Sequence, residues 1–210
     1  ETLGGGVVLG ASNRRLRRNA QSTMKMLQKR LDALGDERAL CEVLLDESGL
    51  TTVDLKRFCV ECGLLPSEMQ PVLDELVKEG RARKVGDKYV SAEQLERGCK
   101  KLADAMDMLH ERHPYVIYHE KAALREAGPK EDRLFDLCLD VLSKRNELEF
   151  SEGMVRRSGY SPPLSEADTK LIKRLEKWFD NTSMETHSIH SASQDMSIKI
   201  TELERLYNIL

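Results

Sequence analysis

Between residues 36 and 80, apolar residues recur at the spacing of three consecutive amphipathic helices. The middle segment has the clearest pattern, with Leu55, Phe58, Cys59 and Cys62 at positions i, i+3, i+4 and i+7. A glycine follows each segment, as is typical of helix ends. The pattern predicts helices from Asp36 to Ser48, from a cap at Thr51–Asp54 to Gly63, and from Pro66 to Gly80.

The hydrophobic period changes after Gly80. Residues 81–85 and 88–90 have the composition of two short strands, and Gly86-Asp87 between them is a tight-turn sequence. Three short helices followed by a β-hairpin are the layout of a winged helix, in which the hairpin is called the wing. The sequence therefore predicts a winged helix over residues 36–91.

The same layout recurs further along the chain. Residues 138–144 repeat the Leu, Asp, Leu and Lys of residues 72–78 in register, and a second hairpin is predicted over residues 148–156. A long helix from a cap at Ser91 to Arg112 and a helix over residues 118–126 complete this unit. We predict a second winged helix over residues 92–164, and thus a fold that is mainly α with small β-hairpins, built from tandem winged-helix domains.

Residues 165–210 begin a third repeat of this layout. A serine cap at Ser165 precedes a helix to Phe179, and residues 200–207 have the pattern of a later helix. The Ser- and Thr-rich residues 181–194 between them are predicted to be a loop. Since no wing-like segment follows, we expect an incomplete third winged helix over residues 165–210.

Near the start of the chain, Gly5-Gly6-Val7-Val8-Leu9-Gly10-Ala11-Ser12 has almost the spacing of a phosphate-binding G-x-x-x-x-G-K-[ST] loop. Such a loop needs a strand before its glycines and a lysine that neutralises phosphate charge. Here no strand of useful length can precede the glycines, and Ala11 stands in the lysine position. We expect a short strand segment within residues 1–13, followed by a basic linker and helix over residues 14–35.

Composition indicates the class of protein and shows that charge is unevenly distributed along the chain. With 40% hydrophobic, 33% charged and 5% aromatic residues, the 210-residue sequence is typical of a soluble, mainly helical protein with no membrane-spanning run. We expect a cytoplasmic location, with the five cysteines reduced. The net charge is −3, although residues 1–35 carry seven basic and two acidic side chains. Basic charge is therefore concentrated at the front of the chain.

Winged helices commonly bind nucleic acids, which requires basic charge on the contacting elements. The helices that precede the two wings are rich in Asp and Glu, which disfavours binding in a phosphate-lined groove. The first wing is basic, whereas the second carries mixed charge. The basic residues could contact an RNA backbone, or they could simply be exposed to solvent; the sequence allows both interpretations. The candidate contacts are Arg14, Arg15, Arg17 and Arg18 in the linker and Arg81, Arg83, Lys84 and Lys88 in the first wing.

The sequence contains no recognisable catalytic or metal-binding constellation. Cys59 and Cys62 form a C-x-x-C motif, but no second pair completes a zinc site, so we expect core packing, with zinc or redox chemistry as the alternative. His110 and His113 lack the spacing of a zinc-protease motif and are expected at a helix end. No nucleophile stands near a base. We expect a protein that is not an enzyme.

The first residues and the repeated units together resemble one protein family. Thr2–Leu9 is similar to the segment that closes the third barrel domain of the bacterial selenocysteine-specific elongation factor. In that family a basic linker and an arm of tandem winged helices follow, as residues 14–35 and the repeated units do here. The resemblance covers residues 1–180. Gly10–Asn13 departs from it, since many relatives have an Asp-Pro stretch at that point.

The resemblance implies a role in translation. The family arm links a GTPase and tRNA-binding part to a tip that binds an mRNA hairpin, and so supports selenocysteine incorporation at UGA codons. GTP would be the cofactor of the full-length factor, with none in this chain, and the partners would be the mRNA hairpin, selenocysteinyl-tRNA and the ribosome. We expect a monomer that binds no membrane. The alternatives are a DNA-binding winged-helix transcriptional regulator and a protein-interaction scaffold.

Overall fold

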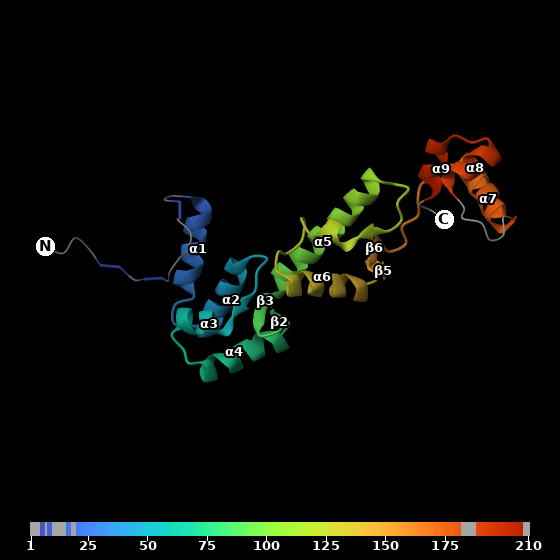
Figure 1. The fold of residues 1–210 in the computed structure, drawn as a ribbon. Coiled ribbons are helices and arrows are strands. Elements are labelled where there is room, and N and C mark those ends of the chain that lie inside the picture. The colour runs from blue at the N-terminus through green and yellow to red at the C-terminus, as the bar shows by residue number, and fades with distance from the viewer. Residues whose placement is uncertain (1–4, 7, 10–15, 18–19, 182–187, 208–210) are drawn as a thin grey trace. The chain divides into compact units, whose positions relative to one another are not determined.

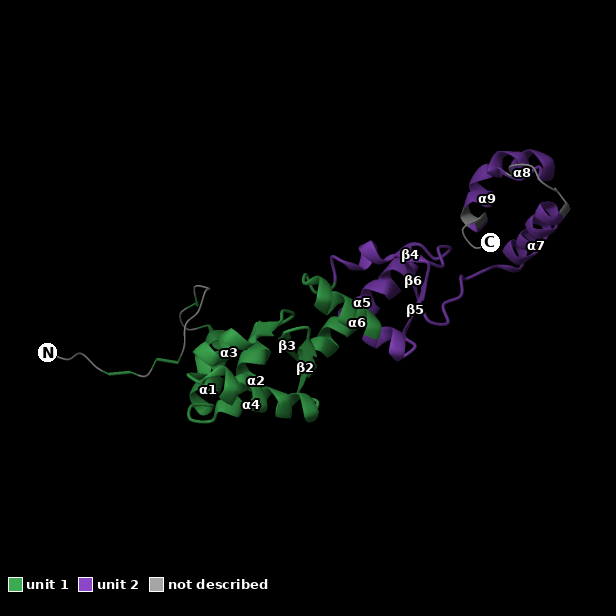
Figure 2. Cartoon of the chain, turned by 60° about the horizontal axis from the view of Figure 1, so that its bottom comes forward, with its two compact units in different colours: residues 1–100, 128–140 green, residues 101–127, 141–210 purple. Residues whose placement is uncertain are grey.

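The computed structural model describes residues 5–6, 8–9, 16–17, 20–181 and 188–207. Helices make up most of these residues, and the strands form two small three-stranded sheets (Figure 1). The chain divides into two compact units, coloured separately in Figure 2. Unit 1 comprises residues 1–100 and 128–140, and unit 2 comprises residues 101–127 and 141–210. None of the helices in these described parts is both long and apolar enough to span a membrane.

The first winged helix follows helix α1, Gln21–Asp32. Its sheet has the strand order β1-β3-β2, and both pairings are antiparallel. Helix, strand, two helices and a hairpin is the element order of a winged helix, which confirms the predicted fold. The elements are α2 (Glu37–Ser48), β1 (Val53–Asp54), α3 (Leu55–Cys62), α4 (Pro66–Lys78), β2 (Ala82–Val85) and β3 (Lys88–Ser91).

The start of α3 differs from the prediction. Thr51 does not cap this helix; the Asp54 carboxylate instead accepts a hydrogen bond from the backbone N–H of Arg57 at 2.8 Å. Val53 and Asp54 form strand β1, in which Val53 pairs with Tyr89. The pairing with β3 holds this segment extended until Asp54, so the helix begins later than the local sequence suggests.

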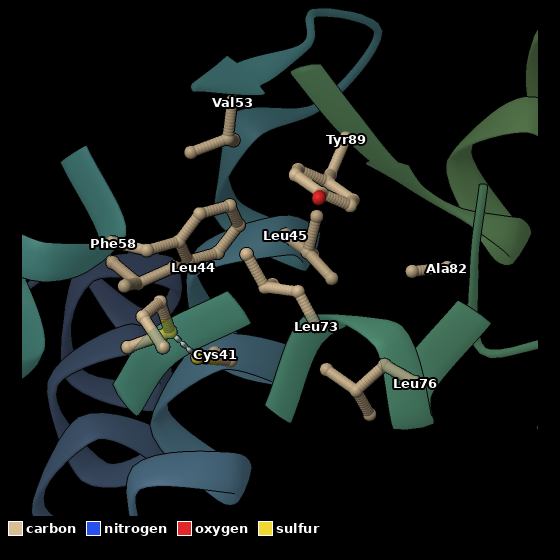
Figure 3. Packing of buried hydrophobic residues seen from close by; sticks show 10 residues of the cluster. Cys41, Leu44, Leu45, Val53, Phe58, Leu73, Leu76, Ala82 and Tyr89 are labelled. Atoms are coloured by element: carbon tan, nitrogen blue, oxygen red, sulfur yellow. Dashed lines mark hydrogen bonds between the residues drawn. The ribbon is translucent and has the colours of Figure 1, made fainter. Parts of the chain in front are cut away.

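One hydrophobic core holds the first winged helix together (Figure 3). Val53 of β1, Phe58 of α3 and Tyr89 of β3 are each at most 1% exposed and converge in it. The rings of Phe58 and Tyr89 pack edge to face, with centroids 6.2 Å apart. Gln70 donates a hydrogen bond to the Tyr89 hydroxyl at 2.8 Å, so the buried ring keeps a polar partner. The hairpin is thereby fixed to the helices through Tyr89.

The element order then repeats. The second sheet has the order β4-β6-β5, again antiparallel throughout. The predicted cap of the long helix is present, since the Ser91 hydroxyl accepts from the Gln94 N–H at 3.0 Å. The elements are α5 (Ala92–Arg112), β4 (His119–Glu120), the 3₁₀ helix η1 (Lys121–Leu124), α6 (Asp132–Lys144), β5 (Leu148–Ser151) and β6 (Met154–Arg157).

The helix predicted over residues 118–126 is wrong. His119 and Glu120 form strand β4, where they pair with Val155 and Met154, and only a single 3₁₀ turn follows. The pairing with β6 uses the backbone groups that a helix would have bonded within itself. Strand pairing over a long sequence separation therefore overrides the local helical pattern.

The last described helices are α7 (Glu166–Asn181), α8 (Ile189–Met196) and α9 (Ile200–Tyr207). A capping box begins α7, because Ser165 N–H donates to Asp168 at 3.0 Å and Asp168 N–H donates to the Ser165 hydroxyl at 3.1 Å. Of the loop predicted over residues 181–194, residues 182–187 lie outside the described part of the chain; the prediction is wrong from residue 189, where α8 begins after a Ser188 cap. Leu175, Ala192 and Leu203 form the core of these helices.

Candidate nucleic-acid interface

The first wing presents its basic residues because its apolar ones are anchored. Ala82, Val85 and Tyr89 are buried, while Arg83 and Lys84 between them are exposed. Gly86, with a φ of 66°, forms the turn in the left-handed region that glycine adopts without strain. The β2–β3 register places Lys84 opposite Tyr89 and Val85 opposite Lys88. The hairpin thus displays cations on a fixed backbone.

Arg83, Lys84 and Lys88 have no ion-pair partner among the described residues. The Nζ of Lys84 lies 5.9 Å from the centroid of the Tyr89 ring. Arg81 differs, since its guanidinium pairs with the Glu42 carboxylate at 2.7 Å. Three of the four predicted wing cations are therefore available to an external anion.

Arg133 adds a fourth cation that the sequence did not single out. Its Nη1 lies 3.6 Å from the Asp87 carboxylate, and a Cβ at Gly86 would overlap its guanidinium. Its side chain is 74% exposed, so it lies over the hairpin turn without being buried there. In sequence Arg133 belongs to an acidic helix, and only the fold brings it to the wing. The wing cluster is defined here as Arg83, Lys84 and Lys88, and Arg133 lies beside it, paired with Asp87.

The helix that a winged helix would place in a DNA groove has the opposite charge. Glu68, Asp74 and Glu75 of α4 are all exposed, and Lys78 is the single basic residue within that helix. Carboxylates facing a phosphate backbone repel it. This arrangement agrees with the sequence-based expectation that α4 does not read a DNA groove.

The second wing has basic residues whose charges are already compensated. Arg156 pairs with Glu149 at 2.5 Å, and its guanidinium lies 4.9 Å from the centroid of the Tyr118 ring. Arg157 pairs with Asp107 at 3.3 Å and with Glu147 at 3.4 Å. The hydroxyl of Ser158 and the guanidinium of Arg156 lower the pKa of Glu149, so that carboxylate stays charged. The second wing therefore lacks the free cations of the first.

The basic linker is described only in part. Arg17 is exposed, whereas Arg14, Arg15 and Arg18 lie outside the described residues. Arg30 of α1 is 6% exposed, and its Nη1 donates to the carbonyl oxygen of Leu9 at 3.0 Å. At least one basic residue near the start of the chain therefore makes contacts within the protein and is not exposed to solvent.

The structure also places the histidine and cysteine motifs. His110 is buried in α5 and stacks on Tyr160 with ring centroids 3.6 Å apart, a contact that no sequence pattern predicts. Cys59 and Cys62 are half-buried and pack against the core of the first winged helix, as expected. In the parts of the chain that the structure describes, no three His, Cys, Asp or Glu side chains are arranged to hold a metal ion.

Comparison with solved structures shows a likeness in fold. No protein-family profile matches the sequence, and no protein of curated function matches it either. The chain is similar to the mRNA-binding domain of elongation factor SelB from E. coli, solved in complex with SECIS RNA. The likeness covers 60% of this chain and 99% of that one, with 12% identity and a TM-score of 0.41.

Proposed function

We propose that the wing cluster binds the phosphate backbone of RNA. The observation that carries this proposal is the charge arrangement of unit 1: Arg83, Lys84 and Lys88 have no ion pair among the described residues, while the neighbouring α4 presents carboxylates. Cations on a fixed hairpin neutralise phosphates and release counterions, which favours binding irrespective of base sequence. RNA would then lie along the wing, away from α4.

We further propose that the chain is the winged-helix arm of a selenocysteine-specific elongation factor. The resemblance of Thr2–Leu9 to the end of that factor's barrel supports this proposal, as does the repeated winged-helix layout. The arm would act as a monomeric spacer without catalysis of its own. GTP and selenocysteinyl-tRNA would bind to other parts of the full-length factor, at the ribosome.

RNA titrations at several salt concentrations test the first proposal. The triple variant Arg83→Ala, Lys84→Ala, Lys88→Ala should bind a hairpin RNA about tenfold more weakly at low salt than the parent chain. Each phosphate contact contributes roughly 0.7–0.9 to the slope of log K against log salt, so loss of three contacts should reduce the magnitude of that slope by roughly 2.1–2.7.

A matched control removes the same charge elsewhere in unit 1. Lys56, Arg57 and Lys78 are exposed on α3 and α4, and none of them has an ion-pair partner among the described residues. Their triple alanine variant should retain most of the RNA affinity. Equal weakening in both triple variants would show a diffuse charge effect and would contradict binding at the wing.

A fusion tests the assignment as an arm. The chain should be placed between the GTPase part and the hairpin-binding tip of a known selenocysteine-specific factor from which the corresponding segment has been removed. We expect restored selenocysteine incorporation at a UGA codon in a reporter. A fusion that folds and binds GTP but gives no readthrough would reject the arm while leaving RNA binding by the wing intact.

A further inference from the structure

Two thiols from different helices meet in the core of the first winged helix. Cys41 lies on α2 and Cys62 is the last residue of α3, and their Sγ atoms are 3.9 Å apart. Both are free thiols. Because the two sulfurs of a disulfide are about 2.0 Å apart, the side chains need to approach each other by about 2 Å to form one.

The surroundings of this pair allow such an approach. Cys41 is 0% exposed, and its thiol also lies 3.4 Å from the sulfur of Met69. Methionine is an adaptable neighbour, because its unbranched side chain can change rotamer without leaving a large void. Cys62 is half-buried at the end of its helix, where it borders solvent more closely than Cys41 does.

We propose that Cys41 and Cys62 are a redox-modification site, at which a low-molecular-weight disulfide such as oxidised glutathione converts the two thiols into a cross-link between α2 and α3. The proposal is independent of RNA binding. Cys59, the other cysteine of the C-x-x-C motif, belongs to the same helix as Cys62, so a bond between those two would join no separate elements.

The reaction is two successive thiol–disulfide exchanges. The Cys62 thiolate attacks one sulfur of oxidised glutathione, whose S–S bond breaks and releases a glutathione thiolate. Cys41 then attacks the Cys62 sulfur, the mixed disulfide bond breaks, and a second glutathione leaves. The first released thiolate takes the Cys41 proton. One disulfide is thus reduced to two thiols while the protein pair is oxidised to one disulfide.

The electrostatics of the pair agree with this order of attack. The sulfur contact with Cys62 and burial raise the pKa of Cys41, while the same contact lowers the pKa of Cys62. Cys62 therefore ionises to the thiolate more readily than Cys41, and it is also the more accessible of the two residues. Cys41 acts second, on a sulfur that already lies beside it.

The cross-link would join α2 to α3 through two cysteines that are 21 residues apart in sequence. Closing a loop of this length restricts the unfolded chain and stabilises the folded one, provided that the native geometry accommodates the bond. The core of the first winged helix, and the wing that Tyr89 anchors to it, should therefore resist unfolding more strongly after oxidation.

Peptide mapping of the full chain tests the site. The purified protein is incubated with oxidised glutathione, remaining thiols are blocked at low pH, and tryptic peptides are identified by mass spectrometry. We expect a disulfide that joins the peptide containing Cys41 to the one containing Cys59 and Cys62. We also expect the thermal midpoint to rise by about 5 °C and to return after treatment with dithiothreitol.

Two variants assign the bond. Cys59→Ser should retain the cross-link, whereas Cys62→Ser should abolish it. If Cys62→Ser does not fold, the peptide maps of the parent chain and of Cys59→Ser are sufficient to assign the bond. Oxidation that yields only glutathione adducts, a Cys59–Cys62 bond, or unreacted Cys41 and Cys62 would overturn the proposal.

Discussion

Thr52 and Glu131, 79 residues apart in sequence, form a double hydrogen bond. The Thr52 N–H donates to one Glu131 carboxylate oxygen at 3.1 Å, and the Thr52 hydroxyl donates to the other at 2.5 Å. The bond connects the residue before β1 to the residue before α6, within unit 1. It therefore links the first winged helix to the start of α6 in the second repeat.

Loss of this carboxylate should destabilise unit 1. Glu131→Ala leaves the half-buried Thr52 N–H and hydroxyl without their partner, at a cost of about 1–3 kcal/mol in the free energy of unfolding. Urea denaturation of the two single variants and of the double variant with Thr52→Val measures the coupling. If the two single effects simply add, the hydrogen bond between the Thr52 hydroxyl and Glu131 does not contribute in solution.

The ion pair of Arg30 should contribute more to stability than pairs on the surface. Arg30 lies 2.6 Å from Glu47 and 3.2 Å from Glu61, and its side chain is 7% exposed. Glu47→Gln removes a negative charge that compensates the buried Arg30 guanidinium, and it should lower the free energy of unfolding by about 2–3 kcal/mol. Glu93→Gln, which removes the exposed pair with Arg97, should cost about 0.5 kcal/mol or less. Equal costs in urea denaturation would contradict a special role for Arg30.

Unit 2 should lose stability as the pH falls. Burial lowers the pKa of His110 and of His119, each with a further contribution from a neighbouring histidine, so both are held neutral in the folded state. The unfolded chain then binds more protons as the pH drops through the ordinary histidine range. The stabilisation is complete above that range and decreases below it.

Thermal midpoints between about pH 8 and about pH 5 measure this effect. His119→Phe removes one titrating group and should make the midpoint less sensitive to pH. The exposed His190 serves as the control, because its replacement by Gln should leave the pH profile unchanged. A profile that is the same for His119→Phe and for the parent chain would refute the assignment.

Release of Arg81 should strengthen RNA binding by the wing. Arg81 is paired with Glu42 at 2.7 Å, so Glu42→Gln leaves an additional cation next to Arg83. The slope of log K against log salt should increase by at most about 0.9, the contribution of one phosphate contact. Asp32→Asn removes an exposed carboxylate of α1 and is the control. Identical effects of both substitutions would indicate that only net charge matters.

Much of the fold could be predicted from the sequence because its signals are local. The helical spacing of Leu55, Phe58 and Cys62 predicts one face of α3, and the Gly86-Asp87 turn predicts the first wing; both are present in the structure. The repeated segment around residues 138–144 likewise predicts α6. Periodicity, caps and turn residues act within a few residues of each other, so they are visible in one dimension.

The candidate site required the tertiary structure. One of the eight predicted contacts, Arg81, is paired with Glu42, which lies 39 residues earlier in the sequence. Arg133, which was not among the eight, is brought to the wing by α6. The failure over residues 118–126 has the same origin, since β4 exists only because β6 pairs with it. The sequence by itself determined the winged-helix layout and the sign of each element's charge. Which charges are free, and which thiols meet, was decided by packing between distant segments, because an ion pair or a sulfur contact depends on separation in space.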